Sequence, residues 1–423
     1  MNIPLFRGRK PLSANPTLNL TGAGIALIAV CYGLARFGYG FFTPIFRTEF
    51  SLSPTTIGFF ASASYIAYCA AIIAATLLTT SLGARNLVIA SGLLAAGSMA
   101  GIALAPNASA LGTAVAATGF CTGLVSPPLA TVIAENVAQK YQSRVQTMVN
   151  SGAGVGVVIS VPIAMTVSSH WRLSWLLFAA LALAATLWIT RSAPRPLPRL
   201  SPDIQLADTG LRIRLLPRPA FPVGSIRLIS ASALLGASST AMLTFGRDFL
   251  IVVGQQSAAI TTTAWVMLGA SGLVGAAAGS LSARFGLGLS WFFGCVSMSV
   301  ASLVLIVWPN SSSLGLISMT LFGAAYTTSA GFLLVWCIQV YYRAQSVGVG
   351  MAFLVIALGQ AIATPLFGFL MVQFGAAMPF YAAAACGLAA GLIMPRISVL
   401  PITTLMEIIP VDQNPDPQMP AQT

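Results

Sequence analysis

Charged residues are scarce in this sequence. Only 7% of its 423 residues are charged, and they comprise 20 Lys and Arg, 8 Asp and Glu, with a single His besides. Soluble domains carry about 25% charged residues. The scarcity excludes a soluble enzyme, a nucleic-acid-binding module and a disordered chain as descriptions of the whole protein. With one His and no acid predicted deep in a helix, we expect no catalytic residues, no cofactor and no metal site.

Apolar residues are abundant instead. They make up 57% of the chain, and the mean hydropathy is +0.88. A transmembrane helix needs about 20 mostly apolar residues, so roughly 240 such residues supply about twelve spans. The apolar runs predict helices at 18–45, 55–79, 86–105, 108–134, 146–168, 169–190, 226–246, 258–282, 286–307, 312–338, 346–371 and 376–395. We therefore predict an all-α membrane protein with twelve transmembrane helices in two six-helix halves.

The placement of basic residues predicts the orientation, because Lys and Arg near helix ends resist translocation. With both termini in the cytoplasm, sixteen of the 20 basic residues lie on that side, while Arg47, Arg172 and Arg247 lie outside. Arg36 is left as the one basic residue well inside a predicted span. The even number of helices and the charge bias agree, and we expect a multi-pass protein of the bacterial cytoplasmic (inner) membrane.

The soluble segments divide the chain. Residues 191–225 hold seven prolines and six arginines, which predicts a cytoplasmic linker between halves at 18–190 and 226–395. Residues 1–17 and 396–423 read as cytoplasmic tails, and the first has no apolar segment with a cleavage site.

An internal repeat links the halves at an offset of 203 residues. Several helix and turn residues align at once: Gly33 with Gly236, Gly83 with Gly286, Pro106-Asn107 with Pro309-Asn310, Leu111-Gly112 with Leu314-Gly315, Gly156 with Gly359, and Pro162 with Pro365. Parallel six-helix repeats are one plan of secondary transporters.

The loops between the second and third helices of each half carry a recognisable pattern. The later copy reads Gly279-Ser-Leu-Ser-Ala283-Arg284-Phe-Gly286, and the earlier one retains Gly83 and Arg85. This resembles the Gly-x-x-x-Asp-Arg-x-Gly-Arg-Arg loop of the major facilitator superfamily, although Ala283 and Thr80 replace its acid. The resemblance implies gating loops on the cytoplasmic side that involve Gly83, Arg85, Gly279, Arg284 and Gly286. Close helix packing by glycine is the alternative explanation.

The first helix contains Ala35-Arg36-Phe37-Gly38-Tyr39-Gly40, which resembles a branch of bacterial major facilitator permeases with no settled substrate. The superfamily resemblance covers nearly the whole chain. It implies a secondary active transporter that works by alternating access between its two halves. It leaves the substrate open.

Arg36 is the principal candidate for substrate contact. An ionisable group inside the bilayer is unfavourable by about 2.5–3.5 kcal/mol on insertion scales, so it is a functional candidate by default. Tyr32, Arg36, Tyr39 and Thr43 recur at spacings of four, three and four, which predicts one polar stripe facing the space between the halves. Further candidates near mid-span are Tyr65, Tyr326 and Gln360.

The type of substrate follows from that charge. A guanidinium suits carboxylate or phosphate, so we expect a small organic anion. Efflux of amphipathic or drug-like compounds, with Arg36 tying helices together, is the alternative, and a membrane enzyme or sensor fits less well. The expected partners are a small-molecule substrate and the lipid bilayer. A coupling proton or sodium ion stays open, nucleic acid is not expected, and the protein is expected to be a monomer.

Overall fold

The computed structural model describes residues 13–166, 170–194, 222–341 and 345–395, and over these residues the regular structure is entirely helical. The first set of elements comprises α1 (Ala14–Ile28), the π-helical η1 (Ala29–Arg36), α2 (Phe37–Glu49), α3 (Pro54–Leu82), α4 (Ala84–Ala103), α5 (Ala108–Asn136), α6 (Gln139–Asn150), α7 (Gly152–Thr166) and α8 (Trp171–Ser192). The second set comprises α9 (Ser225–Thr240), the π-helical η3 (Ala241–Phe245), α10 (Gly246–Val252), α11 (Ala258–Ser271), the 3₁₀-helical η4 (Gly272–Ala277), α12 (Ala278–Phe285), α13 (Leu287–Val307), α14 (Ser312–Val340), α15 (Gln345–Phe374) and α16 (Met378–Leu392).

Ten helices in the described part of the chain are long and apolar enough to cross a membrane. α16 is a shorter apolar helix, and the predicted span at 146–168 is divided between α6 and α7. Most of the predicted helical ranges agree with the observed ones to within a few residues. Residues 1–12 and 396–423 of the predicted tails and residues 195–221 of the predicted linker lie outside the described residues.

The division of the 146–168 helix corrects the sequence-based expectation. Helical structure begins earlier, at Gln139, and α6 ends at Asn150. The Ser151 hydroxyl donates to the Met148 carbonyl at 2.7 Å, and Gly152 and Gly154 follow. A serine that bonds back to a preceding carbonyl bends a helix, and glycine disfavours one, so the break falls at Ser151.

The predicted helix at 258–282 is also not uniform. Its middle six residues, η4, are wound as a 3₁₀-helix between α11 and α12. Gly275 lies in this stretch, and a Cβ there would be 2.9 Å from the Thr327 Cβ of α14. Glycine thus allows the tighter turn to lie directly against the neighbouring helix.

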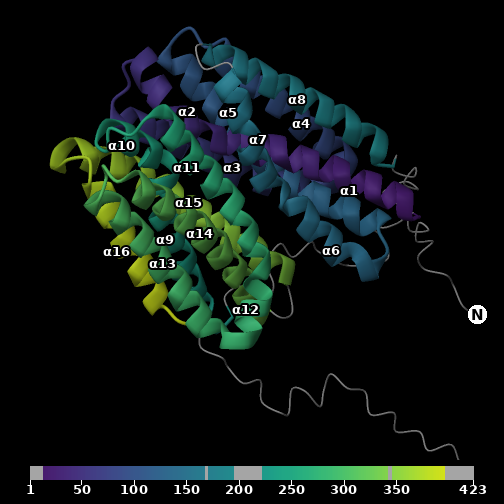
Figure 1. The fold of residues 1–423 in the computed structure, drawn as a ribbon. Coiled ribbons are helices and arrows are strands. Elements are labelled where there is room, and N and C mark those ends of the chain that lie inside the picture. Colours follow the sequence, from purple (N-terminus) through teal and green to yellow (C-terminus); the bar gives the residue numbers. More distant parts are fainter. Residues whose placement is uncertain (1–12, 167–169, 195–221, 342–344, 396–423) are drawn as a thin grey trace, which may run out of the picture.

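The two sets form separate groups of helices (Figure 1). The groups meet where α2 and α10 lie and are apart where α6 and α12 lie. Between them, α3 packs along α15, α7 packs against α11, and α2 packs against η3 and α10.

Equivalent glycines adopt equivalent roles in the two sets, as the repeat predicts. Gly83 has φ 81° and ψ 143°, and Gly286 has φ 80° and ψ 145°. These positive φ values favour glycine because a side chain would be strained there. Gly156 lies against the Ala29 carbonyl of η1, and Gly359 lies against the Ala233 carbonyl of α9.

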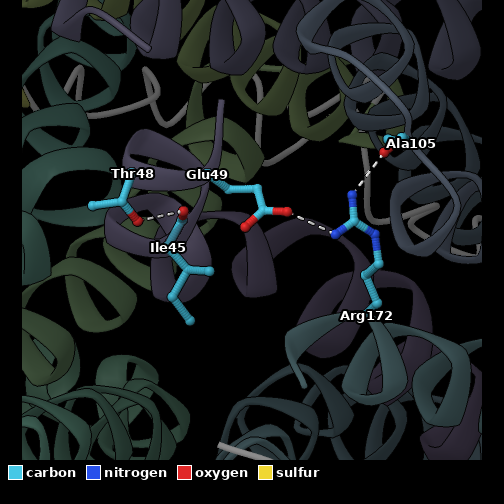
Figure 2. A network of polar contacts seen from close by, with 5 residues as sticks. All are labelled: Ile45, Thr48, Glu49, Ala105 and Arg172. Atoms are coloured by element: carbon cyan, nitrogen blue, oxygen red, sulfur yellow. Dashed lines mark hydrogen bonds and ion pairs between the residues drawn. The ribbon is translucent and has the colours of Figure 1, made fainter. Parts of the chain in front are cut away.

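The ends of α2 and α8 on the predicted outer side are tied together by charge (Figure 2). Arg172 Nη1 lies 2.8 Å from Glu49 Oε1, and Arg172 Nη2 donates to the Ala105 carbonyl at 3.0 Å. Thr48 donates to the Ile45 carbonyl at 2.9 Å, which satisfies a carbonyl in the last turn of α2. The first set is therefore closed by a network at this end.

Candidate functional site

The π-helical segment η1 positions Arg36 at its last residue. Its wider turn interrupts the regular ladder of a 35-residue helix that runs through α1, η1 and α2. The Thr122 hydroxyl of α5 donates to the Cys31 carbonyl in this segment at 2.8 Å. A neighbouring hydroxyl that bonds the backbone stabilises a distorted helix inside a membrane, and single π turns often occur at functional sites.

The guanidinium of Arg36 contacts side chains of two helices, α15 and α3. Nη2 donates to Oε1 of Gln360 on α15 at 3.1 Å. Its Cζ lies 4.3 Å from the ring centroid of Tyr68 and 5.1 Å from that of Tyr65, both on α3. The aromatic faces stabilise the positive charge, because their quadrupole is negative above the ring. Arg36 as a whole residue is partly buried, whereas Gln360 is only 1% exposed.

The orientation of the Gln360 amide is fixed by its partners. Nε2 donates to Ser239 Oγ at 3.0 Å and to the Tyr326 hydroxyl at 3.4 Å. The Ser239 hydroxyl donates in turn to the Gly236 carbonyl at 2.7 Å, so its oxygen is free to accept. Since a guanidinium can only donate, the amide oxygen faces Arg36 and the amide nitrogen faces Ser239.

Tyr32 joins the same cluster from η1. Its hydroxyl lies 2.7 Å from Ser126 Oγ on α5, and its ring meets that of Tyr68 edge to face at a centroid distance of 6.5 Å. Five of the six predicted site residues thus lie in one connected cluster, which we call the Arg36 cluster: Arg36, Tyr32, Tyr65, Tyr326 and Gln360, together with Tyr68, Ser126 and Ser239.

Tyr39 is the predicted site residue that the structure places elsewhere. Its side chain is 6% exposed, and its hydroxyl donates to the Ile57 carbonyl at 2.9 Å. Thr43, the next residue of the predicted stripe, is fully buried and donates to the Tyr39 carbonyl at 2.9 Å. The stripe therefore divides after Arg36, where α2 enters close packing with its neighbours.

Among the residues that the structure describes, no acidic side chain belongs to the Arg36 cluster. Three acidic residues lie in the described part of the chain, and none of them contacts Arg36. Glu49 pairs with Arg172, Asp248 pairs with Arg47 at 2.7 Å, and Glu135 is exposed near the end of α5. Within the residues that the structure describes, the guanidinium is held by a neutral amide and by aromatic rings.

The predicted gating residues have unlike surroundings. Arg85 at the start of α4 donates from Nε to the Ala193 carbonyl at 3.0 Å and from Nη2 to the Thr190 carbonyl at 2.7 Å. It thereby binds the last carbonyls of α8, where a positive charge is favourable. Arg284 is exposed over the ring of Phe285, and a Cβ at Gly279 would meet open space.

The sequence reasoning missed a second polar group, at the predicted outer side. Arg247 and Asp248 are 6% and 4% exposed, whereas the charge placement predicts only that Arg247 lies on the outer side. The Arg247 guanidinium donates to the Phe41 carbonyl and lies 4.0 Å from that ring, while Asp248 binds Arg47. We call Arg47, Arg247, Asp248 and Phe41 the outer clasp. The adjacent Arg-Asp pair directly after the predicted helix 226–246 was the available signal.

A groove of about 270 Å³ lies elsewhere, between α1, η1, α7 and α8. Its lining is apolar and includes Val30, Ile159, Leu181 and Trp188. It presents almost no polar surface, so it offers nothing to hold a charged solute.

Comparisons with known proteins agree with the helical architecture. The solved structures that resemble this one include the D-xylose-proton symporter (TM-score 0.72, 17% identity, 90% of this chain and 97% of that chain). They also include the nucleoside transporter NupG (TM-score 0.68, 15% identity, 90% and 98%) and a mutant of the peptide transporter POT in complex with sulfate (TM-score 0.71, 14% identity, 90% and 95%).

Sequence comparison identifies the family. A search of the curated proteins finds no significant match. The family model described as Major Facilitator Superfamily matches residues 25–357. Because this match covers well over half of the sequence, the chain belongs to the Major Facilitator Superfamily.

Proposed function

We propose that the protein is a secondary active transporter that moves a small organic anion across the bacterial inner membrane by alternating access. Membership of a transporter superfamily and the multi-pass helical fold support transport rather than catalysis. The proposal includes twelve membrane spans, with the 15-residue α16 and the divided segment α6–α7 as the two beyond the ten long apolar helices.

The observation that supports an anionic substrate is the charge of Arg36, which no acidic side chain among the described residues contacts. A guanidinium within a span is unfavourable unless it is paired, and the hydrogen-bond partner of Arg36, Gln360, is neutral. A carboxylate or phosphate supplies the missing charge through short, charge-assisted hydrogen bonds. Tyrosine rings around the cluster add apolar surface for the rest of a small molecule.

The arrangement of the two sets supports an inward-facing state. With both termini in the cytoplasm, the ends that meet at α2 and α10 face outward, and the separated ends at α6 and α12 face inward. The division into halves at 18–190 and 226–395 and the cytoplasmic tails belong to the same proposal, as does a monomer. Rocking of one half against the other about the Arg36 cluster would expose it to each side in turn.

Uptake by proteoliposomes tests the proposal. We expect labelled acetate, lactate, benzoate or succinate to accumulate with the wild-type protein, and Arg36→Gln to reduce uptake of the transported anion to the protein-free level. Arg36→Lys keeps the charge but lacks the bidentate fork, so we expect partial uptake. Imposed proton and sodium gradients in the same vesicles identify the coupling ion.

Arg144→Gln is the matched control, because it removes one exposed positive charge from α6, outside the cluster. It should transport as the wild type does. Size-exclusion profiles and thermal unfolding of each variant show whether the fold is kept. Normal anion uptake by a folded Arg36→Gln protein would contradict the proposal.

The hydrogen bond between Arg36 and Gln360 favours the second candidate, efflux of amphipathic compounds with Arg36 as a tie between helices. In that case drug-like cations and neutral compounds should move, and Arg36→Gln should lower the unfolding temperature without removing their transport. The same vesicles loaded with a fluorescent amphipathic dye distinguish the two.

A further inference from the structure

Gln360 occupies an unusual place in the Arg36 cluster. Each polar group of its buried amide is engaged, with the oxygen accepting from Arg36 and the nitrogen donating to Ser239 and Tyr326. Arg36 belongs to the first set of helices, whereas Gln360, Ser239 and Tyr326 belong to the second. The amide therefore spans the boundary between the two sets.

We propose that Gln360 is a neutral stand-in for the carboxylate of the substrate, and that it holds the two halves together until an anion displaces it from Arg36. This inference rests on the proposed function. Gln360 is then a positioning residue whose oxygen marks where a substrate oxygen binds.

The chemistry of the guanidinium supports the displacement. Nη2 is shared by the end-on and side-on edges through which a guanidinium binds a carboxylate, and Gln360 takes a hydrogen of that nitrogen. A carboxylate that binds through the edge to which this hydrogen belongs must displace the amide oxygen. It wins the competition because a carboxylate brings the opposite charge and a second oxygen that matches the guanidinium fork, whereas the amide offers one neutral oxygen.

The contacts behind the amide determine what is released. When Arg36 turns to an anion, Gln360 stays with Ser239 and Tyr326 in the second set. The next residue, Ala361, accepts a hydrogen bond from Ser62 Oγ of α3 at 2.7 Å. Loss of the Arg36 bond thus removes a polar link between the sets directly beside the packing of α3 on α15, which is the surface that must shift during rocking.

The decisive variant is Gln360→Glu, which keeps the shape of the side chain and places a permanent carboxylate on Arg36. The carboxylate can also accept from the Tyr326 hydroxyl, so the neighbouring side chains can satisfy it. We expect a higher unfolding temperature than wild type and a loss of lactate and benzoate uptake by about 10- to 100-fold. In an Arg36→Gln background, the gain in unfolding temperature should vanish.

Gln360→Met is the complementary variant, because it fills the same space without an acceptor for Arg36. With the competitor removed, the half-saturating concentration of the transported anion should fall by about 3- to 10-fold. This result does not depend on whether the glutamate variant folds.

Two outcomes overturn the inference. One is a Gln360→Glu protein that transports lactate or benzoate as well as wild type, or that gains no stability from Arg36. The other is an unchanged half-saturating concentration in Gln360→Met. Failure of the proposed function gives a different signature: no anion is taken up by wild type, or uptake persists in Arg36→Gln.

Discussion

At the scale of single residues, the surroundings of Arg36 differ from those of three other arginines within the described helices. Arg47, Arg85 and Arg172 bind carboxylates or helix-terminal carbonyls. Arg36 instead lies over two tyrosine rings and bonds one neutral oxygen. The aromatic rings thus stabilise the charge of Arg36 in the folded protein, and the guanidinium remains available for an anion.

Tyr68 provides a residue-scale test, because its ring is the nearer of the two. Tyr68→Leu should destabilise the protein by about 1 kcal/mol beyond the packing loss and weaken anion binding, since the cation–π interaction is removed. Tyr68→Phe retains the ring and should behave nearly as wild type. The unfolding temperature and the half-saturating anion concentration are the measurements.

Repeating Tyr68→Leu in an Arg36→Gln background isolates the interaction with the charge. If the leucine variant loses the same stability with and without Arg36, the ring is only a packing element.

At the scale of elements, small residues determine how closely the helices approach. A Cβ on Gly156 would collide with the Ala29 carbonyl, and a Cβ on Gly359 would collide with the Ala233 carbonyl. The two contacts are related by the sequence repeat, and each joins a helix that starts its half to the fifth helix of that half. Without glycine at these positions, η1 would lie farther from α7, and α9 would lie farther from α15.

Alanine substitution tests this packing. Gly156→Ala and Gly359→Ala should each lower stability by roughly 1–3 kcal/mol, because backbone must move to accept the methyl group. Gly97→Ala is the control, since a Cβ there meets nothing within 4 Å. It should be neutral or slightly stabilising, because alanine favours a helix by about 1 kcal/mol. Thermal unfolding of the three proteins in detergent is the comparison, and equal losses in all three would contradict the packing argument.

At the scale of the whole molecule, the outer clasp holds the two sets together at one end. The Arg47–Asp248 ion pair joins α2 to α10, and the Asp248 side chain is only 6% exposed. Asp248 also lies beside the buried Arg247, which donates to the Phe41 carbonyl. The ion pair stabilises the closed outer end, and removal of the carboxylate leaves the charges of Arg47 and Arg247 without it.

Asp248→Asn should therefore open the outer end. We expect the closed arrangement to lose roughly 1–3 kcal/mol, so that the open population rises. Spin labels on cysteines placed at the exposed Thr48 and Val252, in a background with the half-buried Cys386 replaced by serine, report the distance between α2 and α10. If the labelled Asp248→Asn protein gives the same distance distribution as the labelled protein that retains Asp248, the outer clasp does not hold this end.

Much of the architecture and part of the site followed from the sequence. Apolar runs and turn residues predicted the helices, because a bilayer demands long apolar segments whatever their neighbours are. The insertion penalty singled out Arg36, and polar residues near mid-span led to Tyr32, Tyr65, Tyr326 and Gln360. Tyr39 fits the same spacing but packs elsewhere, because periodicity gives the face of a helix and not what covers it.

The sequence by itself determined that this is a membrane-spanning helical protein and predicted one arginine well inside a span, since hydropathy and charge placement are properties of each segment alone. Only the tertiary structure decided that Gln360 faces Arg36 across 324 positions of sequence and that Arg247 and Asp248 are buried between the halves. Contacts between distant helices depend on how the glycine-lined surfaces approach and on where η1 and η3 widen the turn. These are properties of packing, which no single segment encodes.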